Sequence, residues 1–484
     1  MNEKNIFIDY FKKGISVNLI QVFISFLVGL LTTLVFYNKL SSLGFIIYTS
    51  SQLTVFFFVN FSTLELGNLI KKVVPQSNKI DNSILITNIL KLSITSFLLL
   101  FLIYSFGTYY FNLFNFEELN LGYLVFFIYI FAASLIQIFV NLIYEFLAAE
   151  KKFISIEKLY MKFLSPFRFL LTVVFYIFYS QIEVALLFNV LMRILQLVIV
   201  FKLFGNRSTI KTLLSNKHGK YQRLEIKDNL KFSIKNIIFN NFPLLFFAIS
   251  PNYLENYFNP DDVAVYSLSL ALLNAIKPIL FGLVRIVNPS LVNLVINNSE
   301  NILKKRINFV FSHVRLFHYS LVVIFWLLLN QKELTMIFLE YFSYSLFLDF
   351  IVSIILIMYL YSINMILQSI YVAKNIEKKF FYVSLFSSAI SLIFLMYFAL
   401  GNVAINFVLF SMIIFYFLHY VLLLISLKLF SFREIMIDFV YFLILFNAFR
   451  TYIYSGIYIF GIISILLLVI FISIFKKINK KYIN

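Results

Sequence analysis

The sequence predicts an all-α membrane protein of about fourteen transmembrane helices. Of its 484 residues, 62% are hydrophobic and only 13% are charged, and the mean hydropathy is +0.93. A soluble domain is typically about half apolar and about a quarter charged, so a water-soluble fold is excluded. The second observation is a regular succession of apolar segments, each close to the length of about twenty residues that crosses a bilayer.

These apolar segments follow one another along the chain and are separated by polar turns. The first six are expected at 14–37, 44–70, 84–112, 123–148, 163–179 and 184–204. The next six are expected at 232–249, 263–295, 314–329, 346–373, 380–400 and 403–427. Two more, at 435–449 and 453–475, close the chain.

The positions of the 40 Lys and Arg residues predict the orientation of these helices, because cytoplasmic loops hold an excess of basic residues. Every second loop is basic, as at Lys71-Lys72, Lys151-Lys152 and Lys304-Lys305-Arg306. The alternate loops are short and neutral or acidic, as at Pro260-Asp261-Asp262. The alternation predicts that both the N-terminus and the C-terminus lie in the cytoplasm.

The longest loop, 205–231, is basic and lies near the middle of the chain. We interpret it as a cytoplasmic linker at the lipid surface between two six-helix bundles, 1–204 and 232–430. Residues 431–484 add two further helices and a basic cytoplasmic tail. An internal repeat supports this division, because Asn141 near the end of the fourth span and Asn364 near the end of the tenth are each followed by a small residue and a basic turn.

Residue types that enzymes and metal sites commonly use are scarce. Cysteine is absent, and the four histidines have no metal-ligand spacing. The net charge of +18 resides mainly in the loops assigned to the cytoplasm, where it sets topology. We therefore expect no enzyme activity, no catalytic residue, no metal, no cofactor and no nucleic-acid partner.

Ionisable residues deep within the spans are the candidate binding residues, because each costs on the order of 2.5–3.5 kcal/mol to insert. Lys277 and Arg285 lie on one predicted helix, about 80° apart in azimuth and about 12 Å apart in height. They therefore face broadly the same side and are predicted to contact an anionic substrate. Arg193 is a third deep cation with the same predicted role. The alternative for all three is an ion pair with an acidic residue on another helix.

Two further groups are candidates for polar contacts. Asn18 and Gln21 lie one turn apart in the first span and could contact sugars or hydrogen-bond to another helix. Glu65, near the cytoplasmic end of the second span, either pairs with Lys71 or Lys72 or binds a coupling proton or cation. Other ionisable residues near cytoplasmic helix ends are interpreted as snorkelling to the interface: Lys91, Glu145, Arg168 and Arg315.

Several runs of residues carry a family resemblance that extends over nearly the whole chain. They are Leu43-Gly44-Phe45-Ile46-Ile47-Tyr48, Leu64-Glu65-Leu66-Gly67, Ile70-Lys71-Lys72-Val73-Val74-Pro75, Asp262-Val263-Ala264-Val265-Tyr266, Asn288-Pro289 and Tyr371-Val372-Ala373-Lys374. Together they resemble the Wzx-type polysaccharide (O-antigen) flippases of the multidrug/oligosaccharidyl-lipid/polysaccharide (MOP) exporter superfamily. Glu65 stands where this family usually has Asp, and Ala264 stands where Gly is common.

The resemblance implies a V-shaped transporter in which two six-helix bundles enclose a central cavity and alternate in access. It implies that the substrate is an undecaprenyl-pyrophosphate-linked oligosaccharide, an O-antigen or capsule repeat unit. This substrate would move from the cytoplasmic to the periplasmic or outer leaflet of a bacterial inner membrane. The expected partners are this lipid-linked oligosaccharide, membrane lipids, a glycan polymerase and a chain-length regulator.

Two alternatives remain open at this point. The first is a multidrug or cation antiporter of the same superfamily, for which acidic rather than basic deep residues are expected. The second is a membrane-embedded glycan polymerase or glycosyltransferase, for which a substantial external loop is expected.

Overall fold

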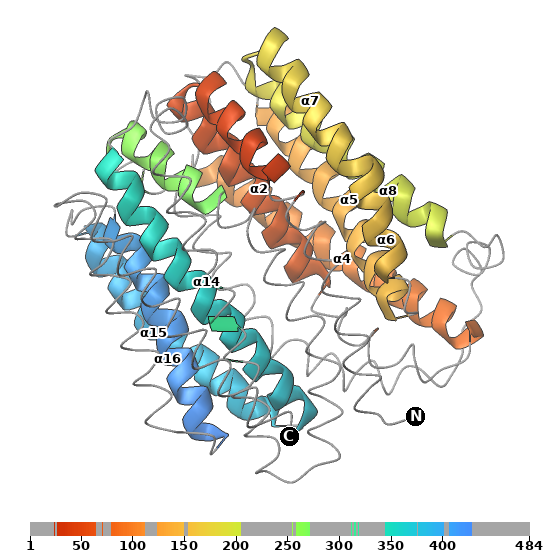
Figure 1. Ribbon diagram of the computed structural model, residues 1–484. Helices are drawn as coiled ribbons and strands as arrows, with labels where there is room; N and C mark the ends of the chain where they lie inside the picture. The colour runs from red at the N-terminus through yellow and green to blue at the C-terminus, as the bar shows by residue number, and fades with distance from the viewer. Residues whose placement is uncertain are drawn as a thin grey trace, which may run out of the picture. The chain divides into compact units, whose positions relative to one another are not determined.

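The computed structural model contains helices and short connecting turns. It describes residues 24, 27–63, 70, 79–111, 123–149, 153–204, 254, 258–271, 311, 314–315, 318, 344–374, 376–400 and 406–427. Within these residues there is no strand, which confirms the predicted all-α class (Figure 1). The chain forms two compact units, Met1–Ala275 and Ile276–Asn484.

Unit 1 is a series of long apolar helices that follow one another in chain order (Figure 1). A helical segment at 27–39 comes first. It is followed by α2 (Ser42–Thr63), α4 (Lys79–Phe111), α5 (Tyr123–Ala149), α6 (Phe153–Leu159), the π-helical turn η3 (Tyr160–Leu164), α7 (Ser165–Phe178) and α8 (Ile182–Phe204).

The lengths of these helices agree with a membrane protein. Seven helices within the described residues of the two units are long and apolar enough to cross a membrane. The predicted spans at 123–148 and 184–204 agree closely with α5 and α8, because both are long, mostly apolar segments bounded by polar turns. The predicted total of about fourteen spans concerns the whole chain and stays a prediction.

Aromatic side chains fill the space between the first helices of unit 1. Helix α2 packs against both α4 and α5. Phe58 of α2 and Phe97 of α4 are fully buried, and their ring centroids lie 5.8 Å apart in an edge-to-face arrangement. Phe97 in turn lies 5.4 Å from Phe131 of α5. Because lipid removes the hydrophobic drive between helices, such close packing is a main source of their association.

The π-helical turn joins α6 and α7 into one continuous stack. The Ser165 backbone N–H donates to the Tyr160 carbonyl, five residues earlier, instead of the carbonyl four residues earlier. Pro166 follows directly. Proline has no backbone N–H, and its ring clashes with the carbonyl four residues earlier in a regular α-helix. Both effects favour the local widening of the helix. Arg168 therefore lies near the middle of the candidate span Tyr160–Phe178, rather than near a helix end as expected.

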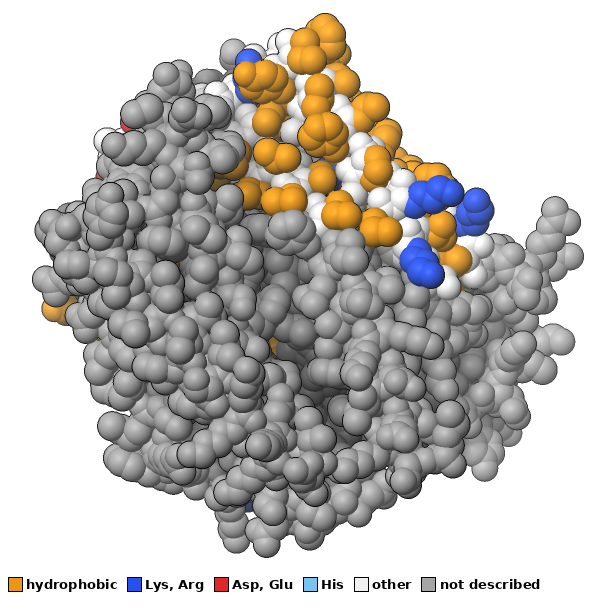
Figure 2. Space-filling model, viewed as in Figure 1, with side chains coloured by type: hydrophobic (Ala, Val, Ile, Leu, Met, Phe, Trp, Pro, Cys, Tyr) orange, Lys and Arg blue, Asp and Glu red, His pale blue; other side chains and the backbone are white. Residues whose placement is uncertain are grey.

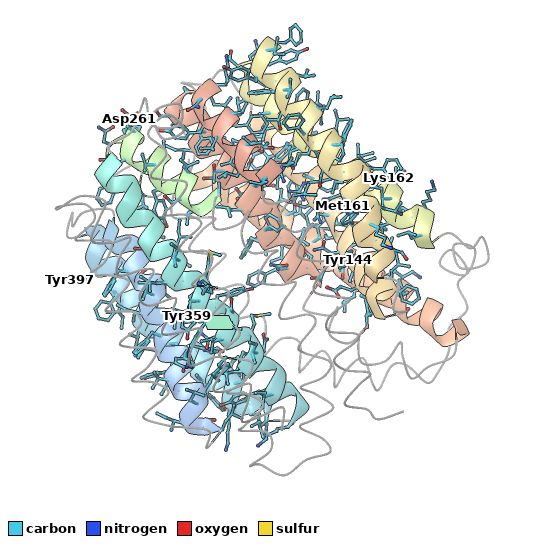
Figure 3. All side chains as sticks on the ribbon, in the orientation of Figure 1. Tyr144, Met161, Lys162, Asp261, Tyr359 and Tyr397 are labelled. Atoms are coloured by element: carbon cyan, nitrogen blue, oxygen red, sulfur yellow. The ribbon has the colours of Figure 1, made fainter. Side chains whose placement is uncertain are left out.

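The outer faces of α7 and α8 form a broad apolar surface. Figure 2 shows hydrophobic side chains over the described face, with Lys and Arg side chains near its ends and most of them at one end. At the end where α6 begins and α8 finishes, Lys158, Lys162 and Lys202 are exposed, and Lys162 is labelled in Figure 3. A surface of this composition fits contact with lipid chains. The exposed apolar residues of these two helices are Phe169, Leu170, Val173, Tyr176, Ile177, Phe178, Leu187, Leu191, Ile194 and Val198.

The start of α2 contacts a helical segment at 260–271 that also belongs to unit 1. Each of these helices begins with a side-chain cap: the Gly44 N–H donates to Ser41 Oγ at 3.0 Å, and the Asp261 N–H donates to Asn259 Oδ1 at 3.1 Å. The Ser42 hydroxyl donates to Asp261 Oδ1 at 2.6 Å. The carboxylate of Asp261 (Figure 3) therefore links two helix N-termini, where a negative charge is favourable.

Unit 2 contains α14 (Tyr344–Ala373), α15 (Glu377–Leu400) and α16 (Asn406–Ser426). Helix α16 packs along both α14 and α15, and the Ser391 hydroxyl of α15 donates to the Ser411 carbonyl of α16 at 2.6 Å. Tyr397 lies on the outer side of α15 (Figure 3) and is 68% exposed. Helices α5 and α14, which carry Asn141 and Asn364, pack against α8 and α16 respectively.

The proposed division of the chain is only partly visible. The predicted linker, 205–231, and the two final helices, 431–484, lie outside the residues described. The predicted boundaries 1–204 and 232–430 therefore stay predictions.

Candidate functional site

A buried arginine lies at the centre of unit 1. Arg193 is 5% exposed and lies midway along α8, about 17 Å from either end of the helix at 1.5 Å per residue. Its guanidinium donates to side chains of α8, α5 and α2, three helices that surround it. The Nε–H donates to Asn189 Oδ1 at 2.8 Å, Nη1 donates to Gln137 Oε1 at 2.5 Å, and Nη2 donates to Gln52 Oε1 at 3.1 Å.

The amides around Arg193 are themselves held in orientation. The Gln52 Nε2 donates to the Tyr129 hydroxyl at 2.6 Å, and this hydroxyl donates to Asn189 Oδ1 at 3.2 Å. The Gln137 Nε2 donates to Asn141 Oδ1 at 2.8 Å. Because each glutamine NH2 group has its own acceptor, each glutamine oxygen is directed at the guanidinium. The shell therefore presents a set of ordered carbonyl dipoles to one cation.

The hydrogen-bond partners of Arg193 carry no charge. Within the described residues, its hydrogen-bond partners are amide and phenol oxygens, and its Cζ lies 5.9 Å from the centroid of the Phe56 ring. Dipoles and an aromatic face stabilise a cation, but they leave its net charge in place. The predicted alternative, an ion pair between Arg193 and an acidic residue, is not found among the described residues.

A second arginine interacts with the first. Arg168 of α7 is partly exposed, and it interacts electrostatically with Arg193 and with Tyr48 of α2. The Thr172 hydroxyl, one turn beyond Arg168, donates to the Arg168 carbonyl at 2.8 Å and lies 2.9 Å from the Thr32 hydroxyl of the first helical segment. The centre of unit 1 therefore carries two like charges in a region that the sequence makes apolar. Like charges in a medium of low dielectric repel each other, so an anion that reached them would be bound favourably.

Of the predicted site residues, only Arg193 falls within the described part of the chain. It lies deep in the bundle, as predicted from its position in the sequence. Lys277, Arg285, Asn18, Gln21 and Glu65 lie outside the described residues, and their predicted roles stay predictions.

Two other predicted snorkelling residues differ from each other. Lys91 of α4 is exposed, which fits a side chain directed to the interface. Arg315 is 4% exposed and donates to the Tyr359 hydroxyl of α14 at 3.1 Å (Figure 3), so it points into unit 2 instead.

Reasoning from the sequence missed most of the shell around Arg193. Gln52, Gln137 and Asn189 each lie well inside a predicted span, and neutral amides in that position were a usable signal. Asn189 also precedes Arg193 by one helical turn, which is the spacing of side chains that meet on a helix. The central position of Arg168 was missed because the fifth span was predicted to begin at 163, where its apolar run starts. The helical stack begins ten residues earlier, at Phe153.

Comparisons with known proteins identify the class of fold. No family model and no curated protein matches the sequence. A structure described as lipid II flippase MurJ in an inward closed conformation is similar with a TM-score of 0.63 and 16% identity over 96% of this chain and 99% of that chain. The MATE multidrug transporter DinF-BH is similar with a TM-score of 0.61 and 13% identity over 87% of this chain and 95% of that chain.

A third similar structure comes from Pyrococcus furiosus and is described as a MOP superfamily transporter in which the reverse polarity of the binding pocket suggests a different function. Its TM-score is 0.51, with 13% identity over 86% of this chain and 95% of that chain. The chain therefore has the fold of MOP-superfamily transporters. At these identities the likeness concerns the fold, and the activity has to be argued from the residues of this chain.

Proposed function

We propose that this protein is a flippase that moves a lipid-linked oligosaccharide across a bacterial inner membrane by alternating access. The substrate is an undecaprenyl-pyrophosphate-linked repeat unit of an O-antigen or capsule. It passes from the cytoplasmic leaflet to the periplasmic or outer leaflet. The observation that carries the proposal is Arg193, a buried cation in the interior of a transporter fold, together with Arg168, which interacts with it electrostatically.

The charge of this pair matches the charge of the proposed headgroup. The pyrophosphate that joins the lipid to the sugar has one ionised oxygen on each phosphorus, and unit 1 offers two guanidinium groups. Arg presents a planar fork of N–H donors that suits phosphate oxygens. The neutral amides that now solvate Arg193 can be exchanged for phosphate oxygens, and the gain is larger because the new acceptors are charged. This pairing favours an anionic substrate.

The same pair of charges argues against a multidrug or cation antiporter. A cationic drug would have to approach the positive charges of Arg193 and Arg168, and like charges in a low dielectric repel strongly. The MATE multidrug transporter shares the fold, but the fold accommodates different substrates. The polarity of the residues inside the bundle therefore favours the flippase over the antiporter.

Lys277 and Arg285 extend this proposal to the start of the second half of the chain. Their predicted position on one helix face would give the pyrophosphate a further pair of cations on its path. Asn18 and Gln21 are the proposed contacts for sugar hydroxyls, and Glu65 is the proposed partner of Lys71 or Lys72. A glycan polymerase and a chain-length regulator are the proposed partners, because they act on the flipped unit.

The experiment that tests this function is depletion of the protein in a cell that makes the oligosaccharide. The proposal predicts that full-length lipid-linked repeat units accumulate in the cytoplasmic leaflet, where an externally added glycosidase cannot reach them. Production of a variant that carries Arg193→Ala should leave the units trapped, whereas Lys91→Ala, which removes an exposed cation of α4, should restore export. If depletion instead leaves single unpolymerised units on the outer side, the protein acts as a polymerase and the flippase proposal is wrong.

A further inference from the structure

A histidine lies at the centre of a second polar group, inside unit 2. His419 of α16, Asn364 of α14 and Ser384 of α15 are each 0% exposed. The three side chains come from three different helices and meet in the interior of the bundle. The proposed anion-binding residues do not use this group, so its chemistry needs a separate explanation.

The hydrogen bonds of Asn364 determine which imidazole nitrogen carries a proton. The Asn364 Nδ2 donates to the Tyr416 carbonyl at 2.8 Å, so its Oδ1 faces the imidazole. The distance from His419 Nδ1 to Asn364 Oδ1 is 3.1 Å. Because an amide oxygen can only accept, Nδ1 must be the donor. The neutral imidazole therefore carries its proton on Nδ1 and its lone pair on Nε2.

Ser384 can hydrogen-bond to His419 Nε2 in both protonation states of the imidazole. Its Oγ lies 2.9 Å from His419 Nε2 and also 2.9 Å from the Phe380 carbonyl of its own helix. In the neutral state, the hydroxyl hydrogen points to Nε2. When a proton binds to Nε2, the new N–H donates to Ser384 Oγ, and the hydroxyl hydrogen turns to the Phe380 carbonyl. Both states are fully hydrogen-bonded, and no atom other than hydrogen has to move.

Two aromatic rings pack against the imidazole. The ring of Phe415 stacks on the imidazole with centroids 5.8 Å apart, and Phe380 meets it edge-on at 5.2 Å. Within the described side chains of the three helices, the titratable groups besides His419 are Tyr359, Tyr361, Tyr371 and Lys374 on or just after α14, Lys378, Lys379, Tyr382 and Tyr397 on α15, and Tyr416 and Tyr420 on α16.

We propose that His419, held by Asn364 and Ser384, is a proton-binding site that couples transport to the transmembrane proton gradient, an inference that rests on the proposed transport function. A buried imidazolium is costly, so the proton binds better in a conformer that lets water reach these three helices. A ligand with different affinities for two conformers shifts their equilibrium. Proton uptake on one side and release on the other would then favour alternate conformers of the transporter.

The first test observes the imidazole directly and does not depend on transport. Protein labelled with ¹⁵N-histidine in lipid nanodiscs is titrated between about pH 8 and about pH 5, the interval in which histidine normally changes charge. His419→Gln identifies the signal, and His318→Gln, which removes another fully buried histidine, serves as the control. The proposal predicts a neutral Nδ1–H form at high pH and protonation of Nε2 on acidification. If His419 stays neutral throughout, it binds no proton and the proposal is overturned.

The second test measures coupling. Vesicles that contain the protein are given a pH gradient, and flipping of lipid-linked oligosaccharide is followed with and without it. Wild type and His318→Gln should be accelerated by the gradient, whereas His419→Gln should flip at the same rate with and without it. Acceleration that survives in His419→Gln would overturn coupling through this residue. Absence of flipping by wild type in any condition would contradict the proposed function, while the histidine spectra would still decide whether the site binds a proton.

Discussion

Replacement of Arg193 by Met separates a role in binding from a role in holding the helices together. The substitution keeps an unbranched side chain of similar reach and removes the charge and the three donors. It leaves the oxygens of Gln52 and Gln137 without their donor, whereas Asn189 keeps the Tyr129 hydroxyl at 3.2 Å. Hydrogen bonds between membrane helices are worth about 0.6 kcal/mol each on average; with the same value for the bond to Asn189 within α8, three lost bonds cost about 2 kcal/mol.

The loss is opposed by relief of a buried charge. Removing an arginine from the centre of a span recovers about 2.5–3.5 kcal/mol on insertion scales. The two effects nearly cancel, so Arg193→Met should change the free energy of unfolding by no more than about 1–2 kcal/mol. Binding should suffer more, because a hydrogen bond to a charged group is worth about 1.5–3 kcal/mol. Flipping at low substrate concentration should therefore fall about 10- to 100-fold.

The assay measures two quantities on the same purified protein. Thermal unfolding in detergent reports stability, and the initial rate of flipping in vesicles, per folded molecule, reports function. Arg193→Lys is the matched control, because it keeps the charge but cannot reach three separate amide oxygens, so it should retain part of the activity. If Arg193→Met unfolds far more readily while the surviving protein flips at the wild-type rate, Arg193 is a link between helices and the binding role is refuted.

Three further predictions concern parts of the chain beyond this cluster. Lys277→Ala or Arg285→Ala should reduce flipping with little change in abundance, and Arg285→Lys should retain some activity; reduced abundance with normal flipping per molecule would identify structural ion pairs. A phosphatase fused after Asp261 should be active and one fused within 205–230 inactive, and the reverse result would refute the predicted topology. Cysteines at Ser42 and Asp261, in a chain with no native cysteine, should cross-link under oxidation. If the contact between the start of α2 and the segment 260–271 opens during transport, the cross-link should stop flipping until a reductant is added. Normal flipping by the cross-linked protein would show that this contact stays closed during transport.

The membrane class and the long helices were predictable because their signals are local. The segments that form α5 and α8 are mostly apolar and end at polar turns, so their bounds could be placed within a few residues. The start of the helical stack before α7 could not be placed. Lys158 and Lys162 interrupt the apolar pattern, and a π-helical turn before Pro166 has no established pattern in the sequence. The packing of 260–271 into unit 1 depends on contacts between distant segments and leaves no local signal.

The candidate site was predictable in its charge and not in its surroundings. The depth of Arg193 marked it as costly and therefore as a candidate binding residue. Its partner Gln52 lies 141 residues earlier in the chain, and the pairing of two such residues depends on how the helices pack. The histidine cluster was missed for the same reason, since His419, Asn364 and Ser384 become a group only when α16 packs against α14 and α15.

Reconstitution in vesicles shows directly whether the protein moves a lipid-linked oligosaccharide across a membrane. The purified protein is placed in vesicles with a labelled undecaprenyl-pyrophosphate oligosaccharide in the inner leaflet, and an externally added glycan-modifying enzyme reports its arrival outside. We expect rapid modification with wild type and slow modification with Arg193→Met or with vesicles that lack the protein. If wild type leaves the labelled lipid inside and instead transports a cationic dye against its gradient, the protein is an antiporter and not a flippase.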